Sequence, residues 1–244
     1  MKRLLIFSYI GLIVPFLISC DSELVAPAGA AQVQTQAAYG SCRTYQYISK
    51  GGEETNYGAA YGEVLLVGFR EGMTLKEKEK LVRQSSLYKS IAGEVAMESG
   101  LITLVQLKPR STCADVELLR DQLQRHPDVL FANPAFKAQP GQEGEVAWLG
   151  LSNEFLVFIE PGTQAQLEAL VAQTNSTLVF SLSEELHLIS VTKTSQGDAL
   201  ALSNLFNQQA FVVTAEPNFV LQAVNGSMQD AASQTVLKKM KQSR

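Results

Sequence analysis

Two histidines, His126 and His187, are the side chains of this sequence best suited to act as a catalytic base. His126 precedes a proline at the expected end of a helix, and His187 lies in an expected strand. Neither has a nucleophile or a carboxylate at the spacing of a catalytic motif. We therefore expect a helix-capping histidine at 126, a solvent-facing strand histidine at 187, and no catalytic residues.

Metal, phosphate and nucleic-acid chemistry are not indicated either. His, Cys and carboxylate residues do not cluster at ligand spacing, and the glycines at 141 and 144 do not link a strand to a helix. The net charge of -4 disfavours a nucleic-acid partner. The charged run 76–80 alternates in sign, which is typical of a solvated helix face. We expect no metal, no cofactor and no enzymatic activity.

Three cysteines allow two kinds of chemistry, lipidation and disulfide formation. Cys42 and Cys113 form an even pair, and disulfides persist outside the cytoplasm, where we expect this chain to be exported on the N-terminal pattern described next. We expect these two residues to form a disulfide, with two free or buried thiols as the alternative. The bridge would tie the segment before the first domain to the start of that domain's second helix.

The N-terminus has two basic residues, Lys2 and Arg3, and continues as a short apolar run that ends in Leu17-Ile-Ser-Cys20. The run is short for a helix that spans a membrane, which needs about 20 apolar residues. Leu17, Ser19 and Cys20 resemble the bacterial lipobox, in which the cysteine thiol takes up the lipid before the signal is removed. We expect a lipoprotein of the bacterial cell envelope, anchored through Cys20 on the extracytoplasmic side of a membrane.

Composition divides the chain into five parts. Residues 1–19 are the expected signal peptide, and residues 20–41, rich in Ala, Gln, Gly and Pro, are an expected flexible tether. Two domains are expected at 42–140 and 151–224, separated by a segment rich in Gly, Gln and Glu. Residues 225–244 form a polar, basic tail, which we expect to be a short helix or disordered.

Residues 63–220 contain the same pattern of elements twice, and the two copies end in similar short sequences. Periodicity predicts a strand, a helix, two strands joined by a short polar turn, a second helix and a last strand in each copy. This order is typical of the split βαβ arrangement. We therefore expect an α+β fold with two tandem ferredoxin-like (βαββαβ) domains, each an antiparallel sheet with two helices on one face. The expected strands are 64–69, 87–97, 101–107 and 129–136, then 155–159, 177–182, 186–191 and 212–219.

The first helix of each copy has a predicted capping box at its start. Thr74 is followed three residues later by Glu77, and Thr163 by Gln166. In this motif the hydroxyl and the later side chain satisfy backbone N–H groups that have no partner within the helix.

The opening strands 64–69 and 155–159 are apolar on both faces. Helices can cover only one face of each sheet. The other face must therefore meet the second sheet or a partner protein, because a bare apolar face of that size would aggregate.

Three features of the sequence resemble the N-terminal prodomain of subtilisin-like serine proteases, of the fervidolysin type and the propeptide-inhibitor family. They are the order of elements, the opening sequence Gly62-Glu-Val-Leu-Leu-Val-Gly-Phe69 and the closing sequence Ala215-Glu-Pro-Asn-Phe219. The resemblance covers about 160 residues, and the first copy departs from it with Asn133-Pro-Ala-Phe136. In that family the open sheet face packs on two surface helices of the protease, and the segment after the last strand lies in the substrate cleft.

The resemblance places the cleft segment at Phe219, Val220, Leu221, Gln222 and Ala223. Such a segment binds by pairing with an edge strand of the protease. No catalytic domain follows the copies in this sequence, so we expect a subtilisin-like protease to be bound in trans and inhibited or assisted in folding. The alternative is a non-enzymatic envelope scaffold whose two sheets pack face to face.

Overall fold

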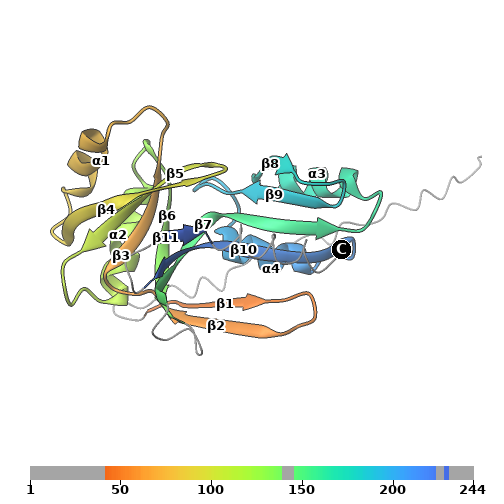
Figure 1. The fold of residues 1–244 in the computed structure, drawn as a ribbon, viewed down its shortest axis with the longest axis horizontal. Helices are drawn as coiled ribbons and strands as arrows, with labels where there is room; N and C mark the ends of the chain where they lie inside the picture. The colour runs from red at the N-terminus through yellow and green to blue at the C-terminus, as the bar shows by residue number, and fades with distance from the viewer. Residues whose placement is uncertain (1–41, 139–145, 224–227, 231–244) are drawn as a thin grey trace, which may run out of the picture.

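The computed structural model describes residues 42–138, 146–223 and 228–230, which form an α+β fold (Figure 1). Four helices and eleven strands lie in these ranges, and all their strand pairings are antiparallel. The predicted α+β class is therefore confirmed. The expected signal peptide, Cys20, the tether and the tail beyond residue 230 lie outside the described residues. None of the helices described is both long and apolar enough to cross a membrane.

The first half of the fold has the predicted order of elements. Its strands pair in the order β6-β3-β5-β4, with β3 and β5 in the centre. Leu81 from α1 and Leu119 from α2 are buried in the same core, so both helices cover the same face of the sheet. The elements are β3 (Val64–Phe69), α1 (Leu75–Val82), β4 (Tyr88–Met97), β5 (Gly100–Leu107), α2 (Cys113–Gln124) and β6 (Val129–Lys137).

The second half repeats this arrangement. Its strands pair in the order β10-β7-β9-β8, and Leu170 from α3 and Phe206 from α4 are buried on one face. A short further strand pairs with the end of β10. The elements are β7 (Val146–Ile159), α3 (Gln164–Gln173), β8 (Thr177–Ser181), β9 (Leu186–Ser190), α4 (Ala199–Asn207), β10 (Val212–Ala223) and β11 (Met228–Asp230).

The two halves join edge to edge through β6 and β7, where Ala135 lies opposite Gly150 and Lys137 opposite Trp148. The result is one nine-stranded sheet. The alternative that the two sheets pack face to face is therefore wrong. Strand β7 also begins at Val146, earlier than the predicted 155 and the predicted domain start at 151, because its first residues pair with β6 and with the end of β10.

A hairpin that the sequence analysis did not predict lies against both halves (Figure 1). The Tyr57 ring lies 5.4 Å from the ring of Phe136 in the first half and 5.0 Å from that of Phe219 in the second, measured between ring centroids. The Tyr47 hydroxyl donates to the carbonyl of Ala215 (2.8 Å). Its strands are β1 (Thr44–Ile48) and β2 (Glu54–Ala59).

Only one of the two predicted capping boxes forms. Thr74 accepts from the N–H of Glu77, whose carboxylate accepts from the N–H of Thr74 (2.7 Å), so the box at α1 is confirmed. The box at α3 is wrong, because the Thr163 hydroxyl instead donates to the carbonyl of Glu160 (2.7 Å) in the preceding turn.

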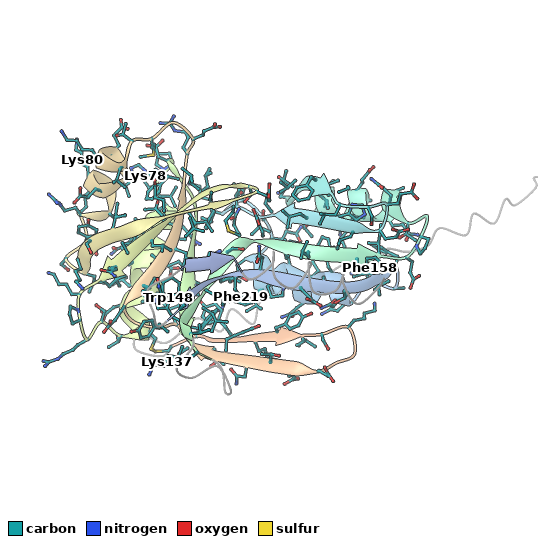
Figure 2. The ribbon with its side chains drawn as sticks, in the orientation of Figure 1. Lys78, Lys80, Lys137, Trp148, Phe158 and Phe219 are labelled. Atoms are coloured by element: carbon teal, nitrogen blue, oxygen red, sulfur yellow. A yellow bond between two sulfur atoms is a disulfide. The ribbon has the colours of Figure 1, made fainter. Side chains whose placement is uncertain are left out.

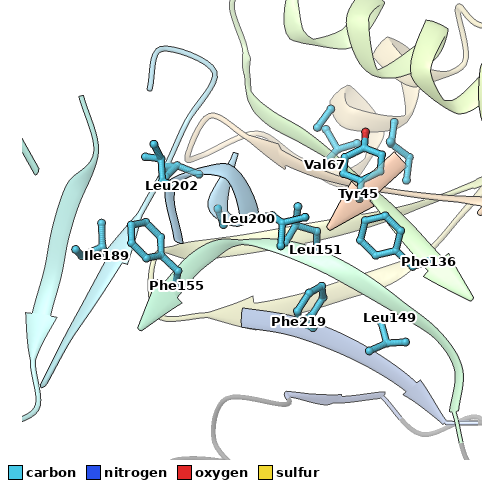
Figure 3. Close-up of a cluster of buried hydrophobic side chains, with 14 of the residues drawn as sticks. Tyr45, Val67, Phe136, Leu149, Leu151, Phe155, Ile189, Leu200, Leu202 and Phe219 are labelled. Atoms are coloured by element: carbon cyan, nitrogen blue, oxygen red, sulfur yellow. The ribbon is translucent and has the colours of Figure 1, made fainter. Parts of the chain in front are cut away.

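One hydrophobic core runs beneath the helices of both halves (Figure 3). Val67 and Phe136 belong to the first half, and Phe155 belongs to the second, where its ring meets the edge of the Phe206 ring at 5.0 Å. Leu151 is fully buried on β7 close to the junction. The helix side of the sheet is therefore continuous from one half to the other.

Candidate functional site

Each half has a sheet face that its own helices do not cover. In the first half this face forms a smaller, separate core, which we call the second core. All of its members are at most 8% exposed. They are Val64, Leu66, Ile102, Leu104, Phe131, Ala135, Trp148 and Val220.

Two members of the second core, Trp148 and Val220, come from the second half. They lie at the start of β7 and near the end of β10, where these strands continue past the sheet of the first half (Figure 2 labels Trp148). The approach is close at Gly150, where an added Cβ would lie 2.5 Å from Cδ1 of Leu66. The junction of the two sheets therefore closes the open face of the first half.

A buried carboxylate also holds the halves together. Glu154 on β7 is 1% exposed and accepts hydrogen bonds from the N–H of Ser99 (2.6 Å) and from the side-chain amide of Asn218 (3.3 Å). Ser99 lies in the β4–β5 turn of the first half, and its hydroxyl accepts from Nδ2 of Asn153 (3.0 Å). Because buried polar groups that lose a partner are costly, these bonds fix the β4–β5 hairpin against the second half.

The second half keeps an apolar surface on its uncovered face, which we call the open patch. Strand pairing places Leu156 and Phe158 of β7 opposite Leu188 and Leu186 of β9, so these side chains share one face. Phe158 is 38% exposed and lies at the end of β7 far from Trp148 (Figure 2). The open patch consists of Leu156, Phe158, Phe180, Leu182 and Leu186, with Leu188 buried among them.

None of the open-patch residues belongs to either core of the described structure. Leu182 is 42% exposed and lies opposite Leu186, whose carbonyl accepts from the Leu182 N–H (2.8 Å). Exposed apolar side chains that adjoin one another mark binding surfaces more often than isolated ones do. The open patch is therefore the candidate functional site.

Acidic residues surround the open patch. Glu216 of β10 lies opposite Leu156, Glu184 and Glu185 lie in the β8–β9 turn, and Glu160 follows β7. Residues 146–223 as a whole contain seven acidic residues against one basic residue. The surface therefore favours a partner that is apolar and basic.

The predicted cleft segment Phe219–Ala223 is not a free extended strand. It forms the end of β10, where Val220 is fully buried and lies opposite Gly150 of β7 on one side and Asp230 of β11 on the other. Because both edges of Val220–Gln222 face another strand, a protease could pair with this segment only if β10 were first separated from a neighbour. The expectation that the segment is free to enter a cleft is therefore wrong for this structure.

The outer edge of β10 is closed at Ala215 as well. The side chain of Asn207 on α4 accepts from the Ala215 N–H (2.7 Å) and donates to its carbonyl (3.0 Å), so the amide occupies the place of a neighbouring strand. The Tyr47 hydroxyl donates to the same carbonyl. A partner therefore meets the face of the second half more readily than this edge.

The predicted disulfide between Cys42 and Cys113 is confirmed, with the two Cα atoms 5.6 Å apart. Cys113 is the first residue of α2, and Cys42 lies just before β1. The bridge therefore fixes the start of the hairpin to the first half. Beside it, the buried Tyr45 hydroxyl donates to the carboxylate of Glu117 (2.8 Å) and accepts from Arg120 (2.7 Å).

His126 lies directly after the end of α2, as predicted, but His187 does not take its expected position. His187 is fully buried, so its prediction as a solvent-facing residue is wrong. Its Nε2 lies 3.1 Å from the Glu184 carbonyl, which can only accept, so Nε2 carries the proton and Nδ1 accepts from the Ser181 hydroxyl (2.8 Å). Burial lowers the pKa of His187. His126 Nδ1 accepts from the Asp128 N–H (3.2 Å), so this ring caps a local turn.

Across the described ranges, no group of three or more His, Cys, Asp and Glu side chains is placed to hold a metal ion. No protein-family model matches the chain, and no curated protein matches it.

The sequence indicated the two-sided apolar character of 155–159 but not the contributions of β8 and β9 to the open patch. The alternation of Leu186 and Leu188 with His187 and Ile189 was the signal that could have shown them.

Proposed function

We propose that this protein is a non-catalytic binding protein of the bacterial cell envelope, built from two tandem ferredoxin-like modules, whose second module binds a subtilisin-like serine protease in trans. The binding surface is the open patch. The single observation that carries this proposal is the contrast between a closed face in the first half and a partly exposed apolar face in the second.

The resemblance to protease prodomains supports the choice of partner. In that family the uncovered sheet face packs on two surface helices of the protease, and the open patch is the uncovered face that remains available here. The buried Val220 argues against simultaneous insertion of the cleft segment. The protein therefore binds the outside of its target and acts as a folding assistant or carrier, and the substrate cleft stays accessible.

Membrane attachment completes the proposal. Cys20 and the N-terminal signal lie outside the described residues, and the lipobox-like sequence before Cys20 supports a lipid anchor. Residues 21–41 would separate the folded part from the membrane surface. The bound protease would then be held at the envelope.

The test uses the mature chain, residues 20–244, and a subtilisin whose catalytic serine is blocked by a small covalent inhibitor. We expect saturable binding to the blocked enzyme and unchanged hydrolysis of a small substrate by the unblocked enzyme. Phe158→Glu should weaken binding at least tenfold, since it places a charge in the centre of the contact. Leu101→Glu is the matched control, because Leu101 is an exposed leucine (50%) of the first half.

Three results would overturn this function. Equal binding by the two variants would show that the open patch does not contact the protease. Loss of binding when the cleft is blocked would show that the protein does insert a segment into the substrate cleft. An absence of binding to any subtilisin-like enzyme would favour the second candidate, a scaffold without a protease target. The closed face of the first half and the doubly paired end of β10 are the observations that favour that candidate.

A further inference from the structure

The two halves of the fold differ strongly in charge. Residues 64–137 contain eleven basic and nine acidic residues, whereas residues 146–223 contain seven acidic residues and only Lys193 as a base. The acidic residues of the second half include Glu216, Glu184 and Glu185 around the open patch. An occupant of this patch should therefore carry positive charge beside its apolar groups.

The chain itself contains a segment of that chemistry. Residues 231–244 have four basic and no acidic residues. Val236, Leu237 and Met240 are its apolar side chains, and in a helix their spacing would place them on one side. The charged residues are Lys238, Lys239, Lys241 and Arg244.

The position of β11 directs this segment toward the open patch. β11 runs antiparallel to β10, with Met228 opposite Gln222 and Asp230 opposite Val220, so the chain leaves β11 in the direction of Glu216. Phe158 is paired with Thr214, six residues before Val220 on β10, a distance of about 20 Å along the strand. Fourteen residues span about 46 Å when extended or about 21 Å as a helix. Phe158 also lies two strands to the side of β11, about 10 Å away in that direction. Val236 and Met240 would lie only about 9 and 15 Å from Asp230 in a continuous helix but about 20 and 33 Å from it when extended, so the segment reaches the patch when its first residues are extended.

We propose that residues 231–244 bind the open patch of their own chain, with Val236, Leu237 and Met240 over its apolar side chains and the lysines beside the surrounding glutamates. The segment then acts as an internal competitor that a partner protein must displace. This regulatory consequence rests on the proposed function, but the binding of the segment to the patch does not.

A second copy of the chain is a less suitable occupant. Two second halves would bring together two strongly acidic surfaces, which repel one another. A segment attached a few residues away is also present at a high effective concentration, on the order of millimolar, without any need for association. Charge and connectivity therefore both favour the chain's own segment.

The test compares the mature chain with a variant that ends at Asp230 and keeps β11. A fluorescently labelled synthetic peptide of residues 231–244 is added to each, and its anisotropy is measured without any protease. We expect saturable binding to the shortened chain and binding at least tenfold weaker to the full chain, whose patch is already occupied. Phe158→Glu in the shortened chain should reduce peptide affinity at least tenfold, whereas Leu101→Glu should leave it unchanged.

A second peptide with Lys238→Glu and Lys239→Glu should bind at least tenfold more weakly, and raising the salt concentration should weaken the original peptide. Equal binding to the full and shortened chains, or no effect of Phe158→Glu, would overturn the inference. Dimer formation by the shortened chain would identify a second copy as the occupant of the patch and would also overturn the inference. Peptide binding to anionic lipid vesicles but not to the protein would identify a membrane as the partner of the segment and would overturn the inference as well. If peptide binding is found but no protease binds, the proposed function alone has failed.

Discussion

The uncovered faces of the two halves differ although the halves share one order of elements. In the first half Leu66 is fully buried beside Gly150 and Trp148, whereas in the second half Phe158 remains 38% exposed. The difference arises because β7 and β10 extend past their own sheet and close the face of the first half. In the described residues the uncovered face of the first half is thus part of a core, whereas that of the second half keeps exposed apolar side chains.

The disulfide is expected to give the largest effect on stability. It closes a segment with a sequence separation of 71 and fixes the hairpin that contacts both halves. Replacing Cys42 and Cys113 by serine should reduce the free energy of unfolding by about 4 kcal/mol, from the loop-closure entropy regained by the unfolded chain. Urea denaturation measures the change. A reduction below about 1 kcal/mol would show that the hairpin is held without the bridge.

Leucine-to-alanine substitutions compare the two faces directly. Leu66→Ala should reduce the free energy of unfolding by about 3 kcal/mol, because it leaves a cavity in the second core. Leu182→Ala should change it by less than about 1 kcal/mol, because Leu182 is 42% exposed. Chemical denaturation of both variants is the measurement. Similar losses would mean that the open patch is as much a part of the core as the second core is.

Gly150 tests the close approach that joins the sheets. An alanine there would place its Cβ against Leu66, and the overpacking should destabilise the fold by about 2 kcal/mol. Gly51→Ala is the matched control, since its added Cβ would meet only Ser49 Oγ at an ordinary 3.8 Å. Thermal melts of the two variants should therefore differ. Equal melting temperatures would show that the junction can move to accept a side chain.

A pH dependence should come from His187 in the second half. Burial lowers its pKa, so the unfolded chain binds a proton at a higher pH than the folded chain does. The fold keeps its full stability above the pKa of this histidine in the unfolded chain, which is about 6.5. As the pH falls below that pKa, the unfolded chain binds a proton that the buried ring does not, so the free energy of unfolding decreases. The melting temperature should therefore fall more between pH 7 and pH 5 in the natural chain than in His187→Gln. Parallel decreases in the two proteins would contradict this assignment.

The sequence predicted which face of each strand is buried better than it predicted which strands pair along their edges. The bounds of β3, β5 and β9 agree with the predicted ranges within one residue, because apolar periodicity reports which side of a strand is buried. Periodicity does not show which edges pair, so the β6–β7 junction and the burial of Val220 were missed.

The hairpin and the buried His187 were missed for different reasons. The hairpin carries its tyrosines on polar strands, and it is stabilised by contacts with side chains distant in sequence, such as Asn204, which accepts from the Ile48 N–H (2.7 Å). His187 is polar by type, and only the positions of Ser181 and the Glu184 carbonyl allow it to be buried. Local pattern does not contain either kind of information.

The proposed function requires that the second half binds a protein through the sheet face that is closed in the first half. Hydroxyl-radical labelling of surface side chains is therefore measured on the chain that ends at Asp230, whose open patch is not covered by residues 231–244, with and without an active-site-blocked subtilisin. We expect labelling of Phe158 and Leu182 to fall on binding while labelling of Leu101 stays constant. A fall at Leu101 with no change at Phe158 and Leu182 would contradict it.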